Sequence, residues 1–91
     1  MSEQKLFAQA DAGEVTVLAP GNTRRVLIHT PELMQVEFSF DKGAIGALHS
    51  HPHVQVSYVV EGRFEVTIDG LTETVGTGGS FIVPSGLVHG V

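Results

Sequence analysis

Short runs of alternating apolar and polar residues, each ending at a turn sequence, constrain the fold of this chain more than any other feature. Residues 34–40 alternate most clearly, because Met34, Val36, Phe38 and Phe40 share one parity and the polar residues share the other. Residues of one parity lie on the same face of a β-strand. No stretch has the helical period that a crossover helix between parallel strands requires. The pattern therefore predicts an all-β protein.

Turn residues separate the predicted strands. Residues 20–22 (Pro-Gly-Asn) form one turn, and Asp69-Gly70 favours the positive φ angles of a two-residue hairpin. Glu61-Gly62 predicts another tight hairpin, between residues 55–60 and residues 63–68. Strands this short and closely spaced predict an antiparallel barrel or double-sheet roll, with residues 1–91 as a single domain. The predicted strands are residues 14–19, 25–28, 34–40, 55–60, 63–68, 71–75 and 80–83.

Composition limits the partners that this chain can have. The composition, with 42% hydrophobic and 16% charged residues, is typical of a compact globular protein. No apolar run approaches the roughly 20 residues of a membrane span, and residues 1–11 show no signal peptide. The net charge is -5 and the few basic residues are scattered, which argues against nucleic acid. The absence of cysteine excludes disulfides and thiolate ligands. We expect a cytoplasmic protein without nucleic-acid or membrane partners.

Four of the five histidines lie in two short segments of the chain. His49 and His51 are two residues apart, so on a strand they point to the same face. Gln55 follows with the same parity, and a rolled sheet would bring His89 to them on a facing strand. Three imidazole nitrogens and an amide oxygen suit one divalent metal ion and leave coordination positions open, as catalytic sites do.

The remaining histidines have a different interpretation. His29 precedes Thr30-Pro31 in a predicted loop, so we expect it away from the site. His53 has the parity of the predicted ligands, but the adjacent Pro52 favours a turn. Both outcomes, with and without a contact between His53 and the metal, stay open. The large side chains expected in the core are Met34, Tyr58, Phe64 and Phe81.

The two histidine segments resemble the two motifs of the cupin superfamily. Residues 43–62 (Gly-x5-His-x-His-x3-Gln-x6-Gly) resemble the first motif, with Gln55 where most members have Glu. Residues 78–89 (Gly-x5-Pro-x-Gly-x2-His) resemble the second. The resemblance implies a cupin-type antiparallel β-barrel, also described as a double-stranded jelly roll.

A narrower resemblance concerns the small metal-binding cupins of pectin and alginate catabolism. Residues 43–53 (GAIGALHSHPH), 57–62 (SYVVEG) and 84–91 (PSGLVHGV) are similar to segments of those proteins. The resemblance implies ring opening of 4,5-unsaturated uronates to a 5-keto uronate, with a small anionic sugar acid as substrate. It also implies one divalent ion, for which Ni, Zn, Fe, Mn and Co stay open. A homodimer is the expected assembly. The implied metal ligands are His49, His51, Gln55 and His89.

The resemblance leaves the catalytic acid and base unassigned. In those cupins the corresponding side chains follow the second motif, so we expect them beyond Val91. We therefore expect the chain to be a fragment that lacks C-terminal strands. The alternative is that a partner chain completes its sheet.

Two other functions stay open. One is an Fe(II)-dependent cupin dioxygenase acting on a small enol or diketone. Gln55 argues against it, because such Fe(II) sites typically include a carboxylate ligand. The other is a non-catalytic sugar- or metal-binding cupin module.

Overall fold

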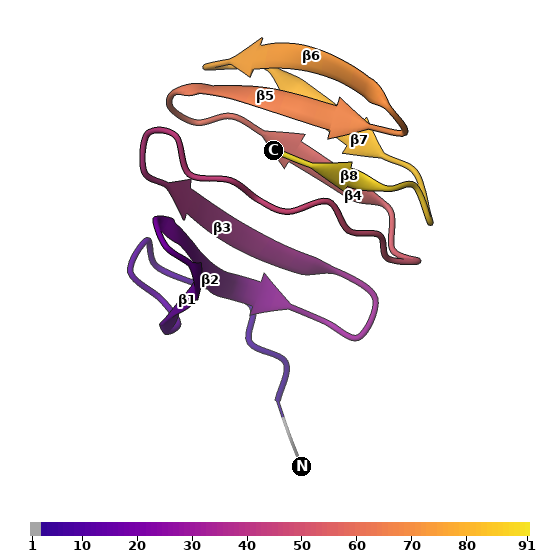
Figure 1. Cartoon of the computed structure of the whole chain (residues 1–91). Helices are drawn as coiled ribbons and strands as arrows, with labels where there is room; N and C mark the ends of the chain where they lie inside the picture. Colours follow the sequence, from indigo (N-terminus) through magenta and orange to yellow (C-terminus); the bar gives the residue numbers. More distant parts are fainter. Residues whose placement is uncertain (1–2) are drawn as a thin grey trace. The chain divides into compact units, whose positions relative to one another are not determined.

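The computed structural model describes residues 3–91, which form eight β-strands (Figure 1). No helix occurs in this described part of the chain, and so none there has the length and apolar character to span a membrane. All strand pairings are antiparallel, and the predicted all-β class is confirmed. The strands are β1 (Val15–Ala19), β2 (Asn22–His29), β3 (Met34–Phe40), β4 (Gln55–Tyr58), β5 (Arg63–Ile68), β6 (Leu71–Gly76), β7 (Ser80–Val83) and β8 (His89–Gly90).

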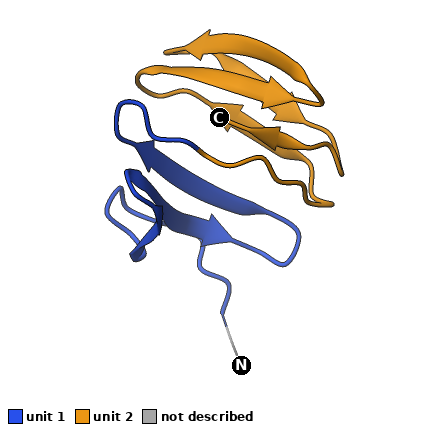
Figure 2. Ribbon diagram, viewed as in Figure 1, with its two compact units in different colours: residues 1–45 blue, residues 46–91 orange. Residues whose placement is uncertain are grey.

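The strands belong to two compact units that divide after residue 45 (Figure 2). The first unit has one sheet with the strand order β1-β2-β3. Ala19 pairs with Asn22, so the predicted turn consists of Pro20 and Gly21. Gly21 has a φ of 73°, which glycine adopts without the steric penalty that a Cβ brings. β3 has the predicted bounds, whereas β2 is longer than predicted at both ends.

The second unit consists of a two-stranded ribbon, β4-β7, and a three-stranded sheet with the order β6-β5-β8. The β5-β6 hairpin confirms the turn predicted at Asp69-Gly70. Ile68 pairs with Leu71, and the two turn residues have φ angles of 49° and 79°. Positive φ at both central positions is typical of a type I′ turn, whose twist matches that of the flanking strands.

The hairpin predicted at Glu61-Gly62 is wrong. β4 pairs with β7, and β5 pairs with β6 and β8, so Gly62 connects two different sheets. The backbone N–H of Gly62 donates to Oγ1 of Thr77 at 3.0 Å, and that hydroxyl donates to the Gly62 carbonyl at 3.2 Å. Val59 exchanges backbone hydrogen bonds with Gly78 and Gly79. These bonds give the polar groups of the connection partners from the β6-β7 loop instead of from β5.

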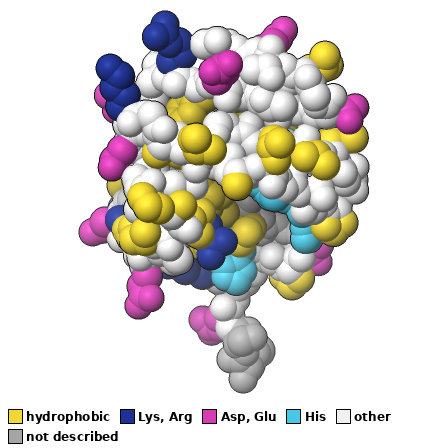
Figure 3. Space-filling view, in the orientation of Figure 1, with side chains coloured by type: hydrophobic (Ala, Val, Ile, Leu, Met, Phe, Trp, Pro, Cys, Tyr) yellow, Lys and Arg dark blue, Asp and Glu magenta, His cyan; other side chains and the backbone are white. Residues whose placement is uncertain are grey.

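Three valines are the buried apolar residues of the described chain. Val59 follows β4, Val66 lies in β5, and Val83 ends β7 with 1% of its surface exposed. All three belong to the second unit. Many large apolar side chains remain at the surface, as the space-filling view shows for one face (Figure 3).

Two of the four side chains predicted in the core are exposed. Tyr58 is 65% exposed because Ser57 and Val59, on either side of it, face inward and strand neighbours alternate. Met34, the first residue of β3, is 56% exposed, and Phe38, of the same parity inside the strand, is exposed as well. Parity alone therefore does not determine what covers a face. Phe64 and Phe81 are half-buried.

The close approach of β8 to residues 46–48 predicts that Gly90→Ala destabilises the protein. A Cβ at Gly90 would lie 2.7 Å from the carbonyl oxygen of Gly46 and 3.1 Å from Cδ2 of Leu48. We expect the free energy of unfolding, measured in urea, to fall by about 1–3 kcal/mol. Gly76→Ala is the matched control, because a Cβ there meets nothing within 4 Å. It should change stability by less than about 0.5 kcal/mol. Equal effects of the two substitutions would contradict this close packing.

Candidate metal centre

Backbone pairing brings three histidines together in the second unit. His49 and His89 form an isolated antiparallel bridge, with His49 N donating to His89 O at 2.9 Å and His89 N donating to His49 O at 2.8 Å. Side chains of such a directly paired couple lie on the same face. His51 follows two residues after His49, so it reaches that face as well. The bridge therefore places on one face residues that are far apart in the sequence.

Neighbouring backbone bonds extend the bridge in both directions. Gly46 and Val91 exchange hydrogen bonds of 3.0 and 3.1 Å, and Gly86 N donates to His51 O at 2.9 Å. The segment that carries the first two histidines is thus fixed along most of its length against the C-terminal segment.

The three imidazoles form a compact cluster. One ligand nitrogen from each of His49, His51 and His89 lies within 4.8 Å of the others. Ring centroids are 4.3 Å apart for His49 and His89, and 4.8 Å apart for His51 and His89. His89 is buried, with 4% of its surface exposed, His51 is half-buried and His49 is exposed. The cluster therefore has a closed side at His89 and an accessible side at His49.

Each ring has the same nitrogen bonded to a backbone carbonyl two residues away. Nδ1 lies 2.9 Å from Ala47 O in His49, from His53 O in His51 and from Leu87 O in His89. A carbonyl oxygen only accepts, so each Nδ1 carries the proton. In a neutral imidazole the other nitrogen, Nε2, then has a free lone pair. This arrangement is typical of metal-binding histidines, whose second nitrogen is held by a carbonyl or carboxylate.

Two features of the cluster are unfavourable without a cation. Nε2 of His89 is buried and has no hydrogen-bond partner in the described structure. Nε2 of His51 lies 3.1 Å from Oε1 of Gln55, and a neutral His51 with its proton on Nδ1 would place two acceptors against each other there. Buried lone pairs without a donor are costly, and a cation would satisfy both. The donors present, imidazole nitrogen and amide oxygen, therefore fit a divalent transition metal.

Gln55, the fourth predicted ligand, lies beside the cluster at the start of β4. Its side chain is half-buried, and its Nε2 donates to Oγ of Ser57 at 3.0 Å. The sequence interpretation did not include Ser57. The period of two along β4, which places Ser57 on the face of Gln55, was the signal that could have found it.

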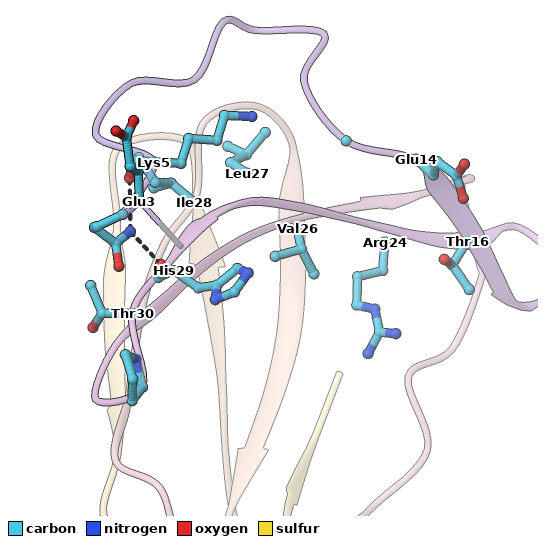
Figure 4. Close-up of a pocket in the computed structure, with 13 residues that line it drawn as sticks. Glu3, Lys5, Glu14, Thr16, Arg24, Val26, Leu27, Ile28, His29 and Thr30 are labelled. Carbon is cyan, nitrogen blue, oxygen red and sulfur yellow. Dashed lines mark hydrogen bonds between the residues drawn. The ribbon is translucent and has the colours of Figure 1, made fainter. Parts of the chain in front are cut away.

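The other two histidines lie outside the cluster. His53 is exposed, and it contacts His51 through its backbone carbonyl. His29 ends β2 instead of lying in the predicted loop, and its carbonyl accepts from Nε2 of Gln4 at 2.8 Å. His29 lines a cavity of about 800 Å³ in the first unit, together with Arg24 and Val26 of β2 (Figure 4). None of the three clustered histidines lines this cavity.

Comparisons with known proteins agree with this arrangement. The sequence pattern of the cupin domain matches residues 36–91. Over 75 residues the chain is 39% identical to the pectin degradation protein KdgF of Dickeya dadantii (strain 3937), an alignment covering 81% of this chain and 68% of that protein.

Two solved structures are also similar. An RmlC-like cupin from Shewanella frigidimarina NCIMB 400 is 42% identical, with a TM-score of 0.89, covering 99% of this chain and 81% of that one. KdgF from Halomonas sp. is 35% identical, with a TM-score of 0.86, covering 96% of this chain and 80% of that one. The predicted cupin fold is confirmed.

The metal content of the protein should depend on the clustered histidine rings and not on the ring of His53. We expect the unaltered protein to purify with a divalent ion and His51→Ala and His89→Ala to purify without it, because each substitution removes a lone pair from the cluster. His53→Ala is the control, since the alanine still supplies the carbonyl that holds His51. Elemental analysis of untagged protein measures the difference. Loss of metal in all three variants would instead indicate general disruption of the segment.

Proposed function

Because the chain belongs to the cupin domain family, we propose that it acts in pectin breakdown as a metal-dependent enzyme. In this proposal it opens the ring of a 4,5-unsaturated uronate to give a 5-keto uronate. The observation that supports this proposal most directly is the cluster of three imidazoles with free Nε2 lone pairs beside an amide oxygen. Similarity to the pectin degradation protein KdgF supports the choice of substrate.

The charge of the donor set favours an anionic substrate. Three neutral imidazoles and the neutral amide of Gln55 offset none of the charge of a dication. A bound divalent ion would supply Lewis-acid chemistry toward the substrate carboxylate and the oxygen on which negative charge develops. His49 is exposed, which leaves the cluster accessible to a substrate, whereas His89 is buried.

The reaction is an isomerisation and needs no oxidant. The hemiacetal hydroxyl at C1 loses its proton and becomes a carbonyl as the bond from C1 to the ring oxygen breaks. The electron pair stays on that oxygen, which remains on C5 as an enolate. Protonation of C4 then gives the 5-keto product. The acid and base for the two proton transfers stay unassigned.

Turnover should appear as loss of the ultraviolet absorbance of the conjugated double bond. We expect a 4,5-unsaturated galacturonate to lose this absorbance with the metal-loaded protein at equal rates in air and under anaerobic conditions. The control is His89→Ala, which should leave the absorbance unchanged. Oxygen uptake in step with turnover would favour the dioxygenase. Saturable binding without absorbance loss would favour the non-catalytic module.

Gln55→Glu tests the importance of a neutral ligand set. The carboxylate keeps an oxygen in place but cancels one unit of charge, which should weaken the attraction for an anionic substrate and its developing negative charge. We expect metal content to be retained and kcat/KM for the unsaturated uronate to fall about tenfold or more, or about 1.4 kcal/mol. An unchanged kcat/KM in the metal-loaded variant would contradict the proposed importance of a neutral ligand set.

A further inference from the structure

We propose that Ser57 is a positioning residue of the metal centre. Its hydroxyl holds the Gln55 amide so that the carbonyl oxygen, and not the NH2 group, faces Nε2 of His51. The inference rests on the proposed metal site, because it concerns how one of the four donors is presented.

The geometry of β4 carries the inference. Gln55 and Ser57 are two residues apart and half-buried, whereas Val56 between them is exposed, so both side chains lie on the inner face. Pairing of β4 with β7 fixes their backbones, since Gln55 pairs with Val83 and Ser57 with Phe81. The Gln55 side chain then spans the two contacts, with Nε2 3.0 Å from Ser57 Oγ and Oε1 3.1 Å from His51 Nε2.

The orientation of the amide decides what Gln55 does at the site. With its oxygen toward the histidines, the amide offers a lone pair to a cation. Rotated by half a turn, the NH2 group would donate to Nε2 of His51 and occupy the lone pair that the cation needs. Gln55 would then compete with the metal instead of binding it.

Ser57 favours the productive orientation because it satisfies the NH2 group. A half-buried N–H without an acceptor is costly, and unsatisfied carbonyl oxygens are tolerated somewhat better. Without the serine hydroxyl, the described contacts of the amide leave His51 Nε2 as the acceptor for the NH2 group. Removal of the hydroxyl should therefore turn the amide away from its metal-binding orientation.

The test is Co²⁺ affinity of the untagged, metal-free full chain, measured by calorimetry together with the visible absorption spectrum of the bound ion. We expect Ser57→Ala to raise the Kd about tenfold, as loss of a group that orients a ligand typically does. The Co²⁺ spectrum should change as well, because an oxygen donor is lost. Ser57→Thr, which keeps a hydroxyl, should restore both. Ser80→Ala, an exposed serine on the neighbouring strand β7, is the matched control and should leave both unchanged.

A double-mutant cycle separates positioning from general structural damage. In the Gln55→Ala background, Ser57→Ala should have little further effect on the Kd, because there is no amide left to orient. An unchanged Kd in Ser57→Ala, or the same tenfold loss with and without Gln55, would overturn the inference. So would the absence of Co²⁺ binding by the unaltered protein.

The same experiment distinguishes this inference from the proposed function. Unaltered protein that opens the uronate ring, combined with normal Co²⁺ binding by Ser57→Ala, would refute only the role of Ser57. Weakened binding by Ser57→Ala, combined with no ring opening by the unaltered protein, would refute only the proposed reaction.

Discussion

The two backbone hydrogen bonds between His49 and His89 are the constraint on which the candidate site depends. Each N–H donates to the carbonyl of the other residue, at 2.9 and 2.8 Å, and the neighbouring bonds of Gly46 and Gly86 hold the same two segments together. Because backbone bonds do this positioning, the imidazole rings are free to use both nitrogens elsewhere. One nitrogen of each ring bonds a carbonyl, and the other joins the cluster.

The hydrogen bonds from the three Nδ1 atoms to backbone carbonyls determine the chemistry of the cluster, beyond the positions of the rings. They fix the same tautomer in His49, His51 and His89, so that three Nε2 lone pairs meet in one place. Lone pairs that converge in a partly buried site are unfavourable without a positive charge between them. The Gln55 oxygen adds a further acceptor to this group. The fold thus concentrates electron-pair donors, which is the property that a metal-binding protein needs.

The errors in the sequence interpretation have identifiable causes. Gln55 on the inner face of β4 requires Ser57 and Val59 to be inward and Tyr58 to be outward, so a ligand at 55 and a core residue at 58 were inconsistent predictions. The Glu61-Gly62 hairpin failed for another reason. A glycine between two short strands is compatible with a tight hairpin and with a connection between sheets, and the hydrogen bonds to Thr77 select the connection.

The sequence by itself determined the all-β class, the Asp69-Gly70 hairpin and the residues of the histidine cluster, because alternation and turn chemistry are local properties. Motif spacing also indicated the family. Only the tertiary structure decided which strands pair, since β4 finds its partner in β7 and the intervening sequence does not specify this. It also decided the tautomers and the role of Ser57 beside Gln55. The partners in those hydrogen bonds lie only two residues apart in the chain, so the sequence brings them near each other. The backbone and side-chain conformations of the folded structure decide whether their atoms come within hydrogen-bond distance.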